Sequence, residues 1–438
     1  MDVLLRGYAV SPETWFYLST LLIIAVFFRF NRFWSLRNLD LVLLLLSAPG
    51  LLLVQKLAEP FWGYVWLFAV SGLYLARLLA DPILQRRPQL GQNLNAGGLI
   101  FLCASAFVFL ATKSITDALP ESTAVTVEHS KALINRENRP DPPEVASEPA
   151  PGPAATLLAA PVEFVFEDLA ARILSILTHG AVVAGLIVAG KKLFGDVHLG
   201  LASSTLYMLL PGTAYSVGSF NHVLPSALIV WAIVFYRSPI VAGVFLGLAS
   251  GAMFFPVFLL PLWFVFYGRN GRWRFSVALA AVALVLVGSL ALTSRDGPTF
   301  VNKILGSIDL QVLAFRSDDK IEGFWKVTEY MSFYRLPVIA LYCIQLALLT
   351  WLPRQKTVEH LLAHSTAIIL STQFWYTQQG GTYLLWYLPM LLMVVFRPRL
   401  LHLVPPDQTI EENASAIRDR AASDSAPTLG SVRSQLYR

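Results

Sequence analysis

Polar residues that could bind a sugar or a phosphate stand out at 219–222, between two apolar runs that each border a basic turn. His222 carries an imidazole that can contact a phosphate or a sugar hydroxyl, since its ordinary pKa of about 6.5 lies close to neutral pH. Asn221 could add hydrogen bonds to the same ligand, or it could cap the helix that follows. The segment therefore predicts either a ligand site or a helix start.

A second polar group occupies residues 373–383 and consists of amides and tyrosines. Amides form hydrogen bonds with sugar hydroxyls and tyrosine rings stack on sugar rings, so the group suits carbohydrate binding. Aromatic belts at a membrane interface have a similar composition, so these residues could instead mark the membrane boundary. The members of the group are Gln373, Tyr376, Gln378, Gln379 and Tyr383.

Charged residues and histidines near or inside apolar runs are further candidates. Glu167 and Asp168 precede an apolar run, where acids favour the positive end of a helix dipole. Arg172 follows by one turn and could clamp a phosphate, extend to the membrane interface or pair with Asp168. His179 and His364 lie inside apolar runs, where a histidine indicates either a site or a hydrogen bond between helices.

The composition indicates the class of fold that holds these residues in place. Of the 438 residues, 55% are hydrophobic and 14% are charged, and the mean hydropathy is +0.59. Soluble proteins are usually about one quarter charged, so we predict an all-α integral membrane protein. The net charge is +5, but Lys and Arg lie in short turns between apolar runs. They indicate membrane orientation rather than a nucleic-acid partner.

Both cysteines, Cys103 and Cys343, lie inside apolar runs and are expected to pack as small apolar side chains. The sequence contains no spacing of His, Cys, Asp and Glu that is typical of a metal site. We therefore expect no metal site and no cofactor, and the sequence leaves a requirement for a divalent metal open.

About thirteen apolar runs predict transmembrane helices. Three lie in an N-terminal membrane segment, 1–96, and the others in a core, 97–400. The runs are 13–30, 39–55, 63–80, 97–112, one that ends at 192, 198–215, 222–236, 240–254, 255–267, 275–293, 336–352, 360–376 and 383–396.

The basic turns predict the orientation of these helices. With the amino end outside and the carboxyl end in the cytoplasm, each cytoplasmic connection contains Lys or Arg, whereas Lys56 is the one basic residue of the short outer connections. This matches the excess of positive charge on the cytoplasmic side of membrane proteins and predicts the cytoplasmic membrane. This orientation depends on the short runs 240–254 and 255–267. If they formed a single bent helix, the predicted orientation of every helix before them would be reversed.

Two long connections, 113–170 and 294–335, are expected to be outer loops. Residues 120–158 are rich in Pro, Glu, Ala and Ser, which bury too little apolar surface to offset the entropy of ordering, so we predict a flexible loop there. The polar tail, 401–438, is predicted to be disordered and cytoplasmic.

Parts of the core resemble the GT-C superfamily of integral membrane glycosyltransferases. FEDLAARILSIL, GLIVAGKKLFG and LGLASSTLYMLLPGTAY look like the second and third membrane helices of that superfamily. GSFNHVLPSALIV resembles its polar G-x-x-N turn before a small-residue helix, and QQGGTYLLWYLPMLLMVVFRP is similar to its last helix. The likeness covers roughly residues 97–400 and is greatest to the branch that uses polyprenyl-phosphate mannose.

The resemblance implies a sugar transfer at the outer face, from a polyprenyl-phosphate donor to an acceptor hydroxyl. A carboxylate soon after the first core helix would act as the general base, and cations or dipoles would stabilise the departing phosphate. Asp117 occupies that place as a single acid, where the family often has a pair; it could also be a solvated loop carboxylate. Glu163, Glu167 and Asp168 are substitutes.

The rival hypothesis is a polytopic membrane protein without catalytic activity, such as a lipid or polysaccharide transporter or a scaffold. It is favoured by the absence of paired carboxylates in the core. Against a transporter, the sequence shows no internal repeat, and ionisable residues inside the apolar runs are sparse. Membrane lipids are expected partners under both hypotheses, and a lipid-linked sugar donor only under the first.

Overall fold

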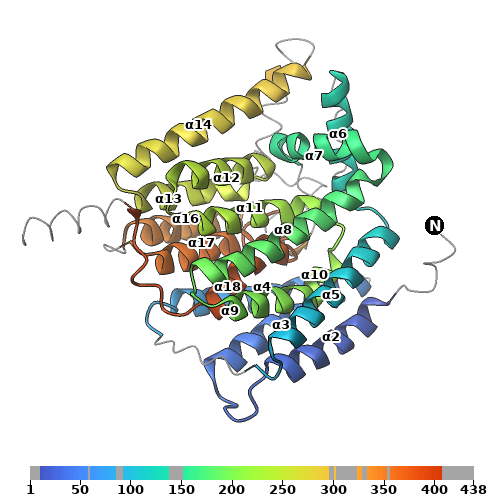
Figure 1. Cartoon of the computed structure of the whole chain (residues 1–438), viewed down its shortest axis with the longest axis vertical. Coiled ribbons are helices and arrows are strands. Elements are labelled where there is room, and N and C mark those ends of the chain that lie inside the picture. Colours follow the sequence, from blue (N-terminus) through green and yellow to red (C-terminus); the bar gives the residue numbers. More distant parts are fainter. Residues whose placement is uncertain are drawn as a thin grey trace, which may run out of the picture.

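A computed structural model describes residues 10–57, 60–84, 92–137, 151–294, 300–301, 323–327, 333–352 and 356–406. Over these residues the chain is helical and contains no β-strand, which confirms the all-α prediction. The helices pack side by side with their axes roughly along one direction (Figure 1).

The first half of the chain forms helices separated mostly by short turns. Proline or an N-capping polar side chain begins several of them, because the first helical N–H groups have no partner within the helix. These helices are α2 (Pro12–Phe27), α3 (Leu36–Lys56), α4 (Phe61–Leu79), α5 (Ala96–Thr116), α6 (Glu121–Asn135), α7 (Pro153–Phe166), η1 (Glu167–Leu169), α8 (Ala170–Lys192), α9 (Val197–Leu209) and α10 (Pro211–Tyr215).

The second half continues with shorter helices in the interior and two longer ones outside. They are α11 (Phe220–Val234), α12 (Pro239–Ala252), η2 (Phe255–Leu259), α13 (Leu260–Phe266), α14 (Arg269–Leu292), η4 (Phe324–Val327), α16 (Arg335–Trp351), α17 (Val358–Thr372), η5 (Leu384–Trp386) and α18 (Leu388–Phe396). Each of the thirteen runs expected to be helical contains a helix.

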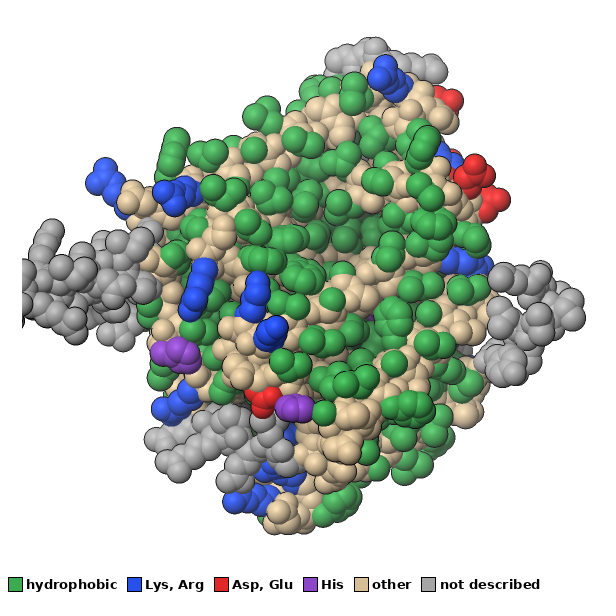
Figure 2. All heavy atoms as spheres, in the orientation of Figure 1, with side chains coloured by type: hydrophobic (Ala, Val, Ile, Leu, Met, Phe, Trp, Pro, Cys, Tyr) green, Lys and Arg blue, Asp and Glu red, His purple; other side chains and the backbone are tan. Residues whose placement is uncertain are grey.

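Five helical segments are long and apolar enough to cross a membrane: α3, α4, α5, the stretch Pro153–Lys192 and α14. Large apolar side chains also remain exposed on the outer faces of α2, α5, α14 and α16, and they cover much of the surface in Figure 2. An apolar surface of this extent is typical of a protein that contacts lipid. The number of thirteen crossings and their orientation stay predictions.

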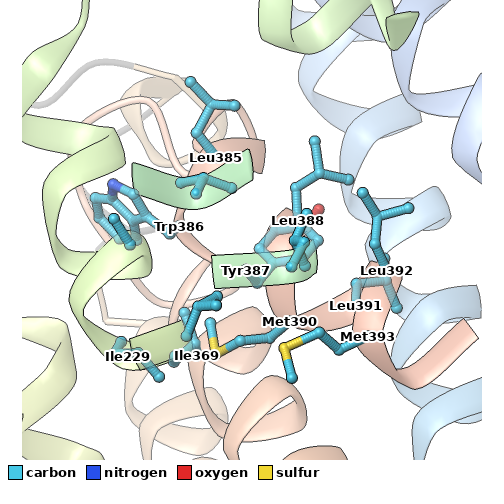
Figure 3. Close-up of a cluster of buried hydrophobic side chains, with 14 of the residues drawn as sticks. Ile229, Ile369, Leu385, Trp386, Tyr387, Leu388, Met390, Leu391, Leu392 and Met393 are labelled. Carbon is cyan, nitrogen blue, oxygen red and sulfur yellow. The ribbon is translucent and has the colours of Figure 1, made fainter. Parts of the chain in front are cut away.

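The short helices α9, α11, α17 and α18 form the centre of the bundle and are almost wholly buried. In Figure 3, apolar side chains of α18 and of the turn before it pack against Ile229 of α11 and Ile369 of α17. Helix breaks are tolerated at this depth because the surrounding protein covers the freed backbone groups. The centre therefore carries several helix ends within the bundle, where side chains can form a site.

Small residues on one face of α12 allow a close approach to α14. Gly243, Gly247 and Gly251 recur every four residues. A methyl group added to each would lie 2.9 Å from the Ala278 Cβ, 3.1 Å from the Val282 Cβ and 2.2 Å from a Leu286 methyl, respectively. Glycine at this spacing lets two membrane helices meet at short range.

The prediction of a flexible segment at 120–158 is wrong for most of the described part, because α6 covers Glu121–Asn135 and α7 begins at Pro153. The two helices pack against each other, and α7 also packs against α8, α12 and α14. The Pro- and Glu-rich residues that dominated the composition lie at 138–150, outside the described residues. The average composition of residues 120–158 does not reveal these two helices. Tertiary contacts offset the conformational entropy that the helices lose on ordering.

The helix ends gather at two opposite ends of the bundle. At the basic end, defined by the turns 28–35, 193–196, 235–238 and 267–268, Lys192 Nζ lies 4.5 Å from the Phe235 ring, and the Tyr267 hydroxyl donates to the Tyr236 carbonyl. The site end is defined by the turns 117–120, 216–219 and 373–383. Figure 2 shows most Lys and Arg side chains in the left and lower parts of the view and most acids at the upper right, where a few Lys or Arg side chains lie as well.

The helices α12 and α13 lie in opposite directions between these two ends. Helix α12 starts after Arg237 and finishes where the Gly152 N–H donates to the Ala252 carbonyl. The chain then returns through η2 and α13 to Tyr267 at the basic end. The two are therefore separate helical segments, as the sequence predicts, whereas their orientation in the membrane stays a prediction.

Two other predicted regions lie largely outside the described residues: most of the loop 294–335 and all of the tail after residue 406. The predicted N-terminal segment contains α2, α3 and α4. These helices share the core with the remaining chain, because α4 packs against α17 and α2 and α3 pack against α10. Residue 96 is therefore a boundary in the sequence without a matching division in the structure.

Candidate functional site

The start of α11 places two polar side chains at the site end. The turn before it is held by its Gly218 carbonyl, which accepts hydrogen bonds from the Thr123 hydroxyl at 3.1 Å and the Ser175 hydroxyl at 3.0 Å. Helix α11 begins at Phe220, and Ser219 is its N-cap residue. Asn221 and His222 therefore stand in the first turn of a helix that α6 and α8 hold in place.

The Asn221 side chain binds α6. Its Oδ1 accepts from the Thr126 hydroxyl at 3.0 Å, and its Nδ2 donates to the Ser122 carbonyl at 2.8 Å. The expectation that Asn221 caps α11 is wrong, since Ser219 holds the cap position. Asn221 instead fastens α6 onto the bundle, and it is buried.

Replacing Asn221 with alanine is expected to lower the free energy of unfolding by about 1–3 kcal/mol, because the buried Ser122 carbonyl and Thr126 hydroxyl lose a partner. The change should also expose α6 to limited proteolysis. Unfolding in detergent micelles and digestion of the purified chain measure the two effects. Ser276→Ala, on a half-buried side chain of α14, is the matched control; equal behaviour of the two variants would contradict the role of Asn221.

His222 faces the other way, towards the turn before α18. The Trp386 Nε1–H donates to its Nδ1 at 2.9 Å, and the His222 and Tyr383 ring centroids are 4.8 Å apart. An indole nitrogen only donates, so Nδ1 must be the acceptor and the neutral ring carries its proton on Nε2. The tryptophan therefore selects one tautomer of a buried histidine.

The rings of Tyr383 and Trp386 contact this histidine. Together with the aromatic rings that pack against them or against one another, they form what we call the aromatic cluster: Phe254, Phe255, Trp375, Tyr376, Tyr383 and Trp386. The Tyr383 and Trp386 rings are stacked 4.4 Å apart, Phe255 stacks on Trp386 at 4.4 Å, and Phe254 stacks on Tyr376 at 5.0 Å. Phe255 and Trp386 lie in η2 and η5, Phe254 and Tyr383 directly precede these two elements, and Trp375 and Tyr376 follow α17. The fold thus brings together three predicted residues, His222, Tyr376 and Tyr383.

The amides of the 373–383 turn shape it and border the aromatic cluster. Gln373 Oε1 accepts from the Gly381 N–H at 3.0 Å, and the Tyr376 hydroxyl donates to Gln378 Oε1 at 3.1 Å. Gln379 has a positive φ of 47°. Gln373 Nε2 and Trp375 Nε1 are buried and have no acceptor among the described residues. Buried donors without a partner are rare, and these two are available for a ligand.

The four predicted carboxylates lie in different environments. The Asp117 side chain is 41% exposed and pairs with Lys113 one turn earlier. Glu167 and Asp168 are exposed in η1. Glu163 alone is buried: its Oε1 lies 3.3 Å from Lys131 Nζ, and its Oε2 has no partner among the described residues. A buried carboxylate with one uncommitted oxygen is the better candidate for a base.

Arg172 caps the end of α5. Its Nη1 donates to the carbonyls of Ser114 at 3.0 Å and Asp117 at 3.2 Å, and also to that of Ile115. These carbonyls lack partners within the helix, and a cation offsets the negative end of its dipole. A role for Arg172 in binding a donor phosphate stays a prediction.

The two histidines inside apolar runs form hydrogen bonds between helices. His179 Nδ1 lies 2.9 Å from the Tyr207 hydroxyl and its Nε2 lies 3.1 Å from the Val217 carbonyl; His364 Nδ1 lies 3.0 Å from the Leu349 carbonyl. This agrees with the second of the two expected roles. Both histidines hold the framework around the site.

Five buried charged side chains form an ion network at the basic end, which the sequence analysis missed. Arg77 binds Asp40 with two hydrogen bonds of 2.8 and 3.1 Å, and its Nη1 donates to Asp81 at 2.9 Å. Arg397 pairs with Asp81 and, at 3.0 Å, with Glu359. The network joins α3, α4, α17 and the end of α18.

Residues around the ion network extend its hydrogen bonds. The Leu400 N–H donates to Glu359 Oε2 at 2.9 Å. Lys356 Nζ donates to the Thr350 carbonyl at 2.6 Å, and burial lowers the pKa of this amine. Lys356 and Glu359 lie in the connection between the predicted runs 336–352 and 360–376, where the basic residues indicate only the orientation in the membrane. The signal in the sequence is an acid or base at or next to the end of each of several apolar runs, such as Asp40, Arg77 and Glu359.

In the described part of the chain, no group of three or more His, Cys, Asp or Glu side chains is arranged to hold a metal ion. A comparison with known protein families, curated proteins and solved structures finds no family model, no curated protein and no structure that matches the chain. These comparisons therefore assign no function to the chain.

Proposed function

We propose that the chain is an integral membrane glycosyltransferase that moves a mannose-like sugar from a polyprenyl-phosphate donor to an acceptor at the outer face of the cytoplasmic membrane. The observation that carries this proposal is a pair of buried donors without an acceptor among the described residues: Gln373 Nε2, and Nε1 of Trp375 in the aromatic cluster. Sugar hydroxyls accept such hydrogen bonds, and aromatic rings stack on the apolar faces of sugars.

The residues of the site have different proposed roles, which follow from the chemistry of their side chains. Tyr376, Tyr383, Gln378 and Gln379 hold the sugar. The Nε2–H of His222 donates to the donor phosphate as negative charge develops on it, which is the stage at which a fixed dipole accelerates the reaction. Asn221 and Arg172 contribute indirectly, by holding the starts of α11 and α8 against α6 and α5.

Glu163 is the proposed general base, which takes the proton of the acceptor hydroxyl while that oxygen forms a bond to the anomeric carbon. The bond from that carbon to the phosphate oxygen breaks, and the polyprenyl phosphate leaves with the electron pair. Burial near Lys131 keeps water away from the carboxylate. Helix α6 links this acid to the other residues, because Lys131 and the Asn221 partner Thr126 are five residues apart on it.

The direct test uses the purified full chain in detergent micelles. Polyprenyl-phosphomannose and polyprenyl-phosphoglucose, each with a radiolabelled sugar, are supplied with a membrane extract as the acceptor source. We expect saturable binding of one donor and release of its lipid phosphate. Trp375→Phe, which keeps the ring and removes the indole N–H, should weaken donor binding several-fold. Binding of neither donor would overturn the proposal.

The proposal also requires the site end to face outward. Asp168→Cys and Arg274→Cys, each in a chain without Cys103 and Cys343, place one thiol at an exposed position near each end of the bundle. A membrane-impermeant maleimide should label the first variant in intact cells and the second only after permeabilisation, because basic turns are retained in the cytoplasm. The reverse pattern would place the site on the wrong side of the membrane.

The second candidate function is a polytopic membrane protein without catalytic activity, which transports a lipid or polysaccharide or serves as a scaffold. It is favoured by one observation: the groups predicted to bind phosphate are engaged internally, His222 with Trp386 and Arg172 with the end of α5. Donor binding without any sugar release would select a transporter. Absence of both would select a scaffold.

A further inference from the structure

A basic hollow of about 810 Å³ lies at the turn between α13 and α14, at the basic end and away from the aromatic cluster. Arg269, Arg272 and Arg274 line it together with Phe264 and Trp273. No acid lines this hollow, and the described residues form no ion pair with any of the three arginines. The hollow therefore concentrates positive charge that has no counterion within the described part of the chain.

One of the arginines is fixed in position across the hollow. Arg272 lies in the first turn of α14, yet its Nε donates to the Phe264 carbonyl of α13 at 3.1 Å, and its guanidinium carbon lies 4.8 Å from the Phe264 ring centre. An arginine held in this way loses little conformational entropy when it binds an anion. Arg269 and Arg274 are exposed beside it.

An apolar stripe leads away from the hollow along α14. Trp273, Val277 and Leu284 follow one another at spacings of four and seven residues, which places them on one face of the helix. Their side chains are 72%, 48% and 72% exposed. Guanidinium groups at one end of an exposed apolar stripe match a ligand that has an anionic head and hydrocarbon chains.

We propose that this hollow binds the headgroup phosphate of an anionic phospholipid, whose acyl chains lie along the stripe of Trp273, Val277 and Leu284. Guanidinium groups bind phosphate oxygens through paired, charge-assisted hydrogen bonds. Trp273 occupies the level between head and chains, where amphipathic rings are enriched in membrane proteins. The lipid would hold the short helix α13 against α14 and is independent of the sugar-transfer site.

The test measures lipid retention by the full chain in detergent micelles with native mass spectrometry. Phosphatidylglycerol, phosphatidylcholine and soluble glycerol phosphate are titrated separately. We expect tight binding of phosphatidylglycerol only. Arg274→Gln should weaken that binding about fivefold, and R269Q/R272Q/R274Q by more than tenfold, because each basic residue near the lipid surface contributes to the attraction. Arg237→Gln, in another basic turn, should leave it unchanged.

Three results would overturn the proposal. Equal binding of phosphatidylcholine would show that the arginines do not select an anion, and competition by glycerol phosphate would identify a site for free phosphate. Equal loss in Arg237→Gln and Arg274→Gln would show a general charge effect. Because Arg274 is exposed and forms no hydrogen bond within the described residues, its single variant is expected to fold even if the triple variant does not.

Discussion

Replacing Arg397 with methionine is expected to lower the free energy of unfolding by about 3–5 kcal/mol, because the change leaves the buried Glu359 without its cation and Asp81 with Arg77 alone. Arg397 is 1% exposed and pairs with Asp81 and Glu359, which are also buried. Methionine has a similar length, so the loss of packing is small compared with the loss of charge. Unfolding of the purified chain in detergent micelles measures the effect.

Two further variants test whether the loss of stability comes from the ion network or from the removal of any charged side chain. R397M/E359Q should recover a large part of the lost stability, because residue 359 then no longer carries an unpaired buried charge and Asp81 keeps its pair with Arg77. Lys56→Met breaks the exposed pair between Lys56 and Glu13 and should leave stability nearly unchanged, since water screens such pairs. If Arg397→Met and Lys56→Met unfolded alike, the ion network would not hold the helix ends together.

Replacing Glu163 with glutamine is expected to reduce the rate of sugar transfer by about 10²–10⁴-fold, which is the usual contribution of a positioned general base. Glutamine preserves the shape of the side chain and removes its ability to accept a proton. Stability should change little, because the lost pair with Lys131 is half exposed on the lysine side. Donor binding should persist, so the rate of transfer is the quantity to measure.

Asp117→Asn is the matched control for this variant. Asp117 is partly exposed and already paired with Lys113, so its replacement should change the transfer rate by less than about threefold, as expected for a surface group that plays no part in proton transfer. The reverse result, a large loss in Asp117→Asn and none in Glu163→Gln, would return the role of base to Asp117. Full activity of both variants would exclude both Asp117 and Glu163 as the general base.

Most of the helices could be predicted from the sequence, because each of these is an apolar run that ends at a basic or prolyl turn. The short pair α12 and η2–α13 was separated correctly, since Pro256 marks the bend. Helices α6 and α7 were missed, because their stability comes from contacts with α8, α11 and α12 rather than from composition. The composition of a segment averages over all its residues. Tertiary packing can stabilise a helix by burying only one of its faces.

The candidate site was predicted in part. His222, Tyr376 and Tyr383 were recognised as polar or aromatic residues in apolar surroundings, and the fold brings them together. Trp375 and Trp386 were not, because a tryptophan in an apolar run has no distinguishing neighbour in the sequence. The role of each tryptophan depends on which acceptor lies next to its indole N–H. For Trp386 this acceptor is His222 Nδ1, on a helix that is distant in the sequence.

The sequence by itself determined that this protein is helical and apolar, where its helices lie and which turns carry positive charge. These properties follow from local periodicity and composition, which each segment carries without reference to the others. Only the tertiary structure decided that Asp40, Arg77, Asp81, Glu359 and Arg397 form one network and that Glu163, rather than Asp117, is buried. Pairing and burial depend on which helix ends meet, and apolar helices can pack in many arrangements until specific side chains select one.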